Sequence, residues 1–223
     1  MTAVAGPAPM GLFGGTFDPI HYGHLRTAFE VLEALQLTEM RFLVAGEPPH
    51  RDSTHADAEA RAALVRAAIA DEPRFQVDER EMRREGPSYS VDTLAELRGE
   101  HPRRTVCLVL GMDAFLGLPR WHRWRDILGL AHVVVAHRPG WQAPQSGPLG
   151  ELLARHRVAD PLELHHAPAG RIHVRPVTQL EISSSAIRAL VRAGKTPRYL
   201  VPDAVCRLLA DSGCYLAAAE GNR

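Results

Sequence analysis

A glycine-rich turn near the start of the chain joins an apolar strand pattern to a helical pattern. Residues 10–13 form a short apolar run, and after the turn apolar residues recur at helical spacing, at Leu25, Phe29, Leu32 and Leu35. Gly14 and Gly15 lack a Cβ atom, so the backbone of the turn can approach a ligand closely. Because a helix start presents unpaired N–H groups and a positive dipole end, the expected ligand is phosphate.

Two histidines stand at the beginning of the expected helix. Pro19 fixes the chain just before His21 and His24, which are three residues apart across Gly23. Both imidazoles can then contact the same bound anion. The alternative is an ordinary strand-turn-helix with two surface histidines, and so short a spacing pattern does not by itself decide between the two.

Short apolar runs alternate with helical patterns along the whole chain. The expected strands are residues 10–13, 40–45, 75–78, 105–110, 132–136 and 172–174. The expected helices begin near residue 25 and then span 56–70, 90–98 with Ser90 as N-cap, 123–128, 149–157, 184–192 and 202–209. This alternation predicts a Rossmann-like doubly wound α/β fold, a parallel sheet with helices on both faces and C-terminal closing helices.

The domain boundaries follow from the same pattern. We expect a single domain at residues 10–217, a flexible N-terminal extension at 1–9 and a short tail at 218–223. Between residues 138 and 170, prolines and glycines interrupt the alternation, so this region is expected to be a long excursion from the sheet.

Charge and composition exclude several classes of protein. Lysine plus arginine and aspartate plus glutamate both number 26, so there is no overall basic field of the kind that nucleic-acid-binding proteins use. No apolar stretch is long enough to span a membrane, and none at the start resembles a signal peptide. Three cysteines without metal-ligand spacing suit a reducing cytoplasm. A small-molecule partner is therefore favoured.

A second candidate anion site lies near the end of the chain. Ser183, Ser184 and Ser185 stand at an expected helix start, where hydroxyl and N–H groups can hold phosphate. Arg188 follows one turn later on the same face, and because Lys195 is the only lysine, a fixed cationic contact to phosphate must almost always come from arginine. The alternative is an ordinary N-cap followed by a surface arginine.

Both segments match known signatures. Gly-Gly-Thr-Phe-Asp-Pro-Ile-His-Tyr-Gly-His, residues 14–24, resembles the signature of the nucleotidyltransferase superfamily that carries a His-x-Gly-His motif, and is most similar to bacterial nicotinate-nucleotide adenylyltransferases. Residues 182–188 resemble the second signature of the superfamily, Ile-Ser-x-Thr-x-x-Arg, with Ser185 where threonine is usual. Eleven matching contiguous residues favour the functional interpretation over the structural one.

The resemblance implies a reaction. AMP would pass from ATP to nicotinate mononucleotide, giving nicotinate adenine dinucleotide and pyrophosphate, with Mg²⁺ held by the ATP phosphates rather than by protein side chains. The implied catalytic residues are Thr16, His21, His24 and Arg188. We expect at least one of the two histidines to be cationic in the ATP complex, because the triphosphate favours the charged imidazole.

The resemblance also divides the site between two substrates. The implied ATP-binding residues are Gly14, Gly15, Thr16, Phe17, His21, His24, Gly111, Asp113, Ile182, Ser183, Ser184, Ser185 and Arg188. The implied nicotinate mononucleotide-binding residues are His50, Arg51, Tyr89, Ser90, Val91, Trp121, His122 and Arg138. Taken singly, each acceptor residue could instead be a loop charge, a helix cap or a core tryptophan.

Three other interpretations remain open. Phosphopantetheine adenylyltransferases and cytidylyltransferases share His-x-Gly-His, although the segments around Ser90 and Trp121 argue against them. A nucleotide sensor without activity could keep the same fold. A metal site built from His21, His24, His50 and His55 would lack a nearby carboxylate or thiolate pattern. Self-association into a homo-oligomer is also left open by the sequence.

Overall fold

The computed structural model describes residues 8–46, 54–137, 142–178 and 180–216. In this part of the chain, seven strands form one sheet with the order β3-β2-β1-β4-β5-β7-β6, and every neighbouring pair is parallel. The strands are β1 (Met10–Gly15), β2 (Glu39–Val44), β3 (Phe75–Asp78), β4 (Val106–Gly111), β5 (His132–His137), β6 (Arg157–Val158) and β7 (Ile172–Pro176). The six predicted strands are confirmed, with bounds that shift by a few residues.

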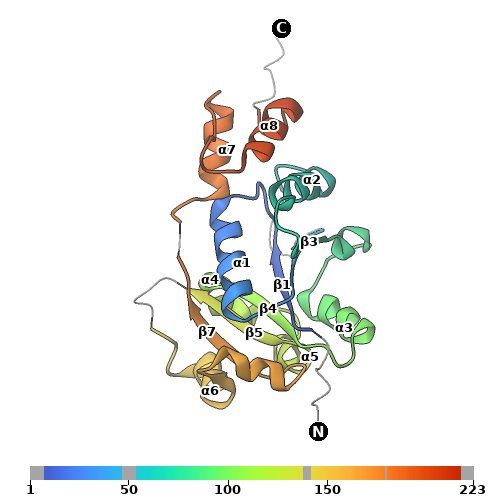
Figure 1. The fold of residues 1–223 in the computed structure, drawn as a ribbon, viewed down its shortest axis with the longest axis vertical. Coiled ribbons are helices and arrows are strands. Elements are labelled where there is room, and N and C mark those ends of the chain that lie inside the picture. Colours follow the sequence, from blue (N-terminus) through green and yellow to red (C-terminus); the bar gives the residue numbers. More distant parts are fainter. Residues whose placement is uncertain (1–7, 47–53, 138–141, 179, 217–223) are drawn as a thin grey trace.

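Helices connect the strands and cover both faces of the sheet (Figure 1). The α-helices are α1 (Tyr22–Ala34), α2 (Ala58–Ile69), α3 (Ser90–Glu100), α4 (Met112–Gly117), α5 (Ile127–Leu130), α6 (Gly147–His156), α7 (Ser184–Arg192) and α8 (Asp203–Ser212). Short 3-10 helices are η1 (Arg80–Arg83), η2 (Leu118–Arg120), η3 (Trp124–Asp126) and η4 (Pro161–His166). None of these helices is long and apolar enough to cross a membrane, which holds for the described residues.

Two details of the sequence prediction are wrong, one helix has shifted bounds and one helix was not predicted. Ser90 is the first residue of α3 rather than its N-cap, a position that Tyr89 occupies. The helix expected at 123–128 is present as η3 and α5, and it begins one residue later because Arg123 is its N-cap, with a left-handed φ of 48°. The region expected to be an excursion from the sheet contains β6, which pairs with β7 at the edge of the sheet. The helix α4 directly follows β4 and was not predicted.

Alternating residues of the central strands build two separate cores. On β4, Val106 and Leu108 face a cluster with residues of α3, α5 and α6, whereas Cys107 and Val109 face a cluster with residues of α1, α2, α7 and α8. Side chains alternate between the faces of a strand, so a strand with apolar residues at every position requires cover on both sides. This confirms the doubly wound arrangement.

The sheet order determines where a ligand can bind. From β1 the chain continues to β2 and β3 on one side, and later passes to β4 and β5 on the other. The connections therefore diverge at the carboxyl ends of β1 and β4, where open α/β sheets form a crevice. Helices α7 and α8 lie together near α1 and α2, as the predicted closing helices (Figure 1).

Candidate active site

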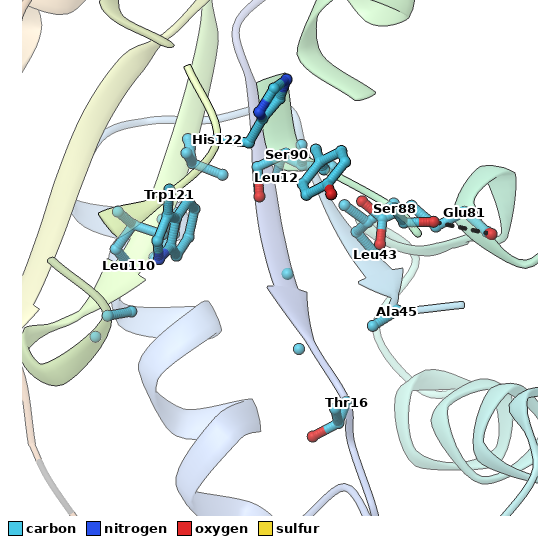
Figure 2. A pocket seen from close by; sticks show the side chains of 17 residues that line it. Leu12, Thr16, Leu43, Ala45, Glu81, Ser88, Ser90, Leu110, Trp121 and His122 are labelled. Atoms are coloured by element: carbon cyan, nitrogen blue, oxygen red, sulfur yellow. Dashed lines mark hydrogen bonds between the residues drawn. The ribbon is translucent and has the colours of Figure 1, made fainter. Parts of the chain in front are cut away.

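A cavity of about 240 Å³ opens at the divergence of β1 and β4. Figure 2 shows Trp121 and Leu110 on one side and Leu43 and Ser88 on the other, with Thr16 at the end of the first strand. The lining residues are Leu12, Gly14, Gly15, Thr16, Leu43, Ala45, Glu81, Ser88, Tyr89, Ser90, Leu108, Val109, Leu110, Gly111, Ala114, Trp121 and His122. The fold thus brings residues predicted for both substrates to one cavity.

The two motif histidines stack on each other. His21 is the N-cap of α1, and the centroids of its ring and the His24 ring lie 3.7 Å apart with an interplanar angle of 25°. The backbone N–H of His21 donates a hydrogen bond of 3.3 Å to Nδ1 of His24. A Cβ atom at Gly23 would lie 2.9 Å from Nδ1 of His21, so glycine at this position leaves room for the stack.

Burial favours the neutral form of both histidines. The side chain of His21 is buried and its Nδ1 has no partner, and desolvation lowers its pKa to about 4. Desolvation, with repulsion from His21 as a second cause, places the pKa of His24 well below its usual value. An incoming triphosphate would oppose both effects, because it supplies several negative charges at short range.

Residues of the second signature, 182–188, contact residues of the first signature, 14–24. Ser183 caps α7 by accepting a hydrogen bond from the N–H of Ala186, and the Ser184 hydroxyl donates one of 2.9 Å to the Pro19 carbonyl. Arg188 donates to the Asp18 carbonyl at 2.5 Å and to the Ser185 hydroxyl at 3.1 Å. Its side chain is 11% exposed, so the surface-arginine alternative is wrong.

Asp18 is a connecting residue that the sequence prediction missed. Its carboxylate is buried and accepts hydrogen bonds from the N–H groups of His55 and Ala56 and from the Tyr215 hydroxyl. Burial alone would raise the pKa of Asp18, but the bond from Tyr215, the two backbone bonds and the charge of Arg188 together lower it. The Asp-Pro within the motif was visible in the sequence, but its partners are too distant along the chain to be foreseen.

The side of the cavity formed by Tyr89, Trp121 and His122 is largely aromatic. Trp121 is partly buried, and it both packs against the core cluster that includes α3 residues and lines the cavity. The rings of Tyr89 and His122 lie 4.5 Å apart at an angle of 36°. The N–H groups of Ser90 and Val91 belong to the first turn of α3, and within the described residues they have no acceptor.

Several predicted residues lie elsewhere or outside the described residues. Val91 is buried in the core, Asp113 is exposed in α4, and neither side chain is among those that line the cavity. Residues Ile182 to Ser185 and Arg188 adjoin the signature turn rather than the cavity. His50, Arg51 and Arg138 lie outside the described residues.

A buried carboxyl group that the sequence did not reveal completes the cavity wall. Glu81 accepts a hydrogen bond of 2.8 Å from the Thr93 hydroxyl, and its carbonyl accepts one from Ser88 (Figure 2). Desolvation raises its pKa, although the bond from Thr93 opposes the shift.

The described residues contain no group of three His, Cys, Asp or Glu side chains able to hold a metal ion.

Known proteins resemble this chain over most of its length. The sequence pattern of the family described as "Cytidylyltransferase-like" matches residues 12–190. A protein of Halorhodospira halophila named "Probable nicotinate-nucleotide adenylyltransferase" is 52% identical over 206 residues, which cover 92% of this chain and 94% of that protein. The chain belongs to the nicotinate-nucleotide adenylyltransferase family.

A second relative agrees with this assignment, and a solved structure agrees with the fold. A protein of Aeromonas hydrophila with the same name is 47% identical over 210 residues, 94% of this chain and 98% of that protein. A solved structure of the Plasmodium falciparum nicotinic acid mononucleotide adenylyltransferase complexed with NaAD has a TM-score of 0.71 at 14% identity, covering 94% of this chain and 98% of that one. The predictions of the family and of the Rossmann-like fold are confirmed.

Proposed function

We propose that this chain transfers AMP from ATP to nicotinate mononucleotide, with nicotinate adenine dinucleotide and pyrophosphate as products. The observation that carries the proposal is the juxtaposition of two parts at the carboxyl ends of β1 and β4. One part is the glycine turn with the stacked histidines, held by α7. The other is the aromatic cavity beside it, which offers a flat surface to a pyridine ring.

The ATP phosphates would bind at the glycine turn and the start of α1. Backbone N–H groups there, together with Thr16, would contact the anion, and the positive end of the helix dipole favours it. His21 and His24 would stabilise the charge that develops on the phosphates, with at least one of them protonated in the complex. Arg188 would hold the turn through Asp18 and add positive charge nearby.

The pyridine ring of the acceptor would lie against Trp121. Its carboxylate would accept hydrogen bonds from the free N–H groups of Ser90 and Val91 and from the Ser90 hydroxyl. Tyr89 and His122 would complete the wall beside the ring. We keep His50, Arg51 and Arg138 as expected contacts to the acceptor phosphate and Gly111 and Asp113 as expected contacts to the adenosine.

The chemical step needs no base and no covalent enzyme intermediate. Above about pH 6 the acceptor phosphate is a dianion, so one of its oxygens can attack the α-phosphorus of ATP directly. A P–O bond to the acceptor forms as the bond between the α-phosphorus and the bridging oxygen breaks, and pyrophosphate leaves with that electron pair. The protein contributes alignment and electrostatic stabilisation.

Mg²⁺ would be held by ATP phosphates and water, and would neutralise part of their charge. The donor set fits this arrangement, because the carboxylate of Asp18 already accepts three hydrogen bonds and is not free to act as a ligand.

The cysteines Cys107, Cys206 and Cys214 are free thiols, which supports the expected cytoplasmic location.

Pyrophosphate release tests the proposal. The purified chain is supplied with ATP or CTP and with nicotinate mononucleotide, its amide or phosphopantetheine, and His24→Ala serves as the low-activity control. We expect release mainly with ATP and nicotinate mononucleotide, and a fall in turnover of about a hundredfold or more in the variant, with KM nearly unchanged. Nucleotide binding without release would instead support the sensor interpretation.

A further inference from the structure

A fully buried arginine lies beneath the glycine turn and has no part in the function described so far. Arg61, on α2, is 1% exposed. Its guanidinium donates to three main-chain carbonyls from separate segments, Thr16 at 2.8 Å, Gly46 at 3.1 Å and Ala56 at 3.3 Å. The fixed fork of a guanidinium can serve three such acceptors at once.

The position is unusual because, within the part of the chain that the structure describes, the guanidinium has no direct ionic partner. No carboxylate of the described residues lies within ion-pair distance of Arg61, and burying a cation without one is costly. An apolar side chain could fill the same space beneath α2 without that cost. The three carbonyls therefore point to a geometric role for the guanidinium at the turn.

The carbonyl of Thr16 determines the direction of the next N–H group. In a trans peptide the C=O and N–H bonds point in opposite directions, so a Thr16 carbonyl held by Arg61 directs the Phe17 N–H away from Arg61. Within the described residues that N–H has no acceptor. Thr16 itself lines the cavity.

The residue after this peptide has a strained backbone. Phe17 has φ of 49°, in the left-handed region that non-glycine residues rarely adopt. Its side chain is buried, with its ring 5.2 Å from that of His24. Such a conformation persists only when the surrounding structure holds it. Here the packing holds the ring of Phe17, and the bond from Arg61 to the Thr16 carbonyl holds the peptide that precedes Phe17.

We propose that Arg61 is a positioning residue for the anion-binding turn, which orients the Thr16–Phe17 peptide so that the Phe17 N–H donates to a phosphate of bound ATP. The inference rests on the proposed function, since it takes the ligand of the turn to be ATP. The bonds to Gly46 and Ala56 fix the guanidinium from two further sides, so that it cannot follow the turn if the peptide rotates.

Replacement of Arg61 by lysine or by glutamine distinguishes the proposed positioning role from a purely structural one. Arg61→Lys keeps the charge but cannot serve the three carbonyls with one geometry, and Arg61→Gln keeps one donor group without charge. Arg66→Lys is the matched control, because Arg66 lies on the same helix but is exposed and pairs with Glu59 and Glu79. For each variant we measure the melting temperature, kcat and KM for both substrates.

A direct probe of the peptide does not depend on turnover. The chain is labelled with ¹⁵N-phenylalanine, which gives six amide signals, and the Phe17 signal is identified with Phe17→Leu. A non-hydrolysable ATP analogue with a methylene group between the α- and β-phosphates is then added. We expect it to shift the Phe17 signal in the wild-type chain and in Arg66→Lys, and to shift it much less in Arg61→Lys and Arg61→Gln.

The kinetic expectation is a loss in kcat of at least tenfold in folded Arg61→Lys, with KM for nicotinate mononucleotide within about threefold of wild type. The inference is overturned by a Phe17 signal that does not respond to the analogue in the wild-type chain, or that responds equally in the Arg61 variants. A loss of activity that only follows the unfolded fraction would overturn it as well. A wild-type chain that binds the analogue but transfers no AMP would refute the proposed function and leave the test of Arg61 intact.

Discussion

The hydroxyl of Tyr215 donates a hydrogen bond of 2.6 Å to Asp18, a residue 197 positions earlier in the chain. Tyr215 is buried, and the carboxylate that it contacts also accepts the backbone bonds that fix residues 55 and 56. A residue that follows the last helix therefore supports the turn that precedes the first one. This contact links the stability of the C-terminal segment to the geometry of the site.

Tyr215→Phe should destabilise the protein by about 1 to 3 kcal/mol, because it leaves one lone pair of a buried carboxylate without its donor. The change is measured as the free energy of unfolding in urea at pH 7. Tyr199→Phe is the control, since Tyr199 is 81% exposed and its loss of a hydroxyl should have little effect. Equal stabilities of the two variants would contradict a structural role for the Tyr215 bond.

The stability of the unliganded protein should fall as the pH decreases from about 6.5 to about 4. Burial lowers the pKa of His21 from 6.5 to about 4, so the unfolded chain binds more protons in this interval and gains in population. A shift of this size corresponds to about 3 kcal/mol for one group. Above pH 6.5 the group is neutral in both states and has no effect.

Urea unfolding of His21→Asn at several pH values checks this prediction. The variant should lose less stability than the wild-type chain between pH 6.5 and 4, although His24 retains a dependence of the same sign. His166→Asn replaces an exposed histidine of η4 and should keep the wild-type slope. If His21→Asn also keeps that slope, the neutral state of buried His21 is not a source of the acid sensitivity.

Arg188→Lys should lower kcat/KM for ATP by at least about tenfold, because an ammonium group cannot contact the Asp18 carbonyl and the Ser185 hydroxyl as the guanidinium fork does. Arg192→Lys changes an exposed residue at the end of the same helix and should behave as wild type. Steady-state kinetics with varied ATP distinguish the two. Wild-type values in Arg188→Lys would remove Arg188 from the ATP site.

The nicotinate acceptor should be used at least about a hundredfold more efficiently than its amide. The N–H groups at the start of α3 can donate to a carboxylate, whereas an amide presents donors of its own, and each lost charge-assisted bond costs roughly 1.5 to 3 kcal/mol. The measurement is kcat/KM for the two acceptors at fixed ATP. Equal efficiency would leave only a general pyridine-nucleotide specificity.

Trp121→Ala should raise KM for the nicotinate acceptor by about tenfold or more and leave KM for ATP nearly unchanged, since the indole lines the cavity where we propose that the acceptor ring binds. Trp124→Ala is the comparison, because Trp124 packs beside the same core but does not line the cavity. A larger effect on ATP than on the acceptor would contradict the division of the site.

The sheet could be predicted because its central strands are apolar at nearly every position and are separated by helical patterns. The strand β6 could not, because it has two residues and is defined by its pairing with β7 alone. The start of α3 was misplaced by one residue, since Tyr89 caps the helix without a side-chain hydrogen bond and leaves no signal in the sequence.

The site was predictable where residues share a strand end or a helix start. Gly14, Thr16, Ser90 and Trp121 meet at one cavity because parallel strands present their carboxyl ends at the same edge. Arg61 was placed in a helix, but nothing local distinguishes a buried arginine from an exposed one. The contacts of Asp18 depend on segments far away in the chain and could not be read from spacing.

The dependence of the signature turn on α7 has a consequence for the order of synthesis. Ser184 and Arg188, which contact Pro19 and Asp18, follow them by 165 and 170 residues. A ribosome therefore produces the turn long before the helix that holds it. The growing chain carries this turn without its support until α7 has been synthesised, and a chain released before residue 184 would carry the histidines but not the helix that fixes the turn.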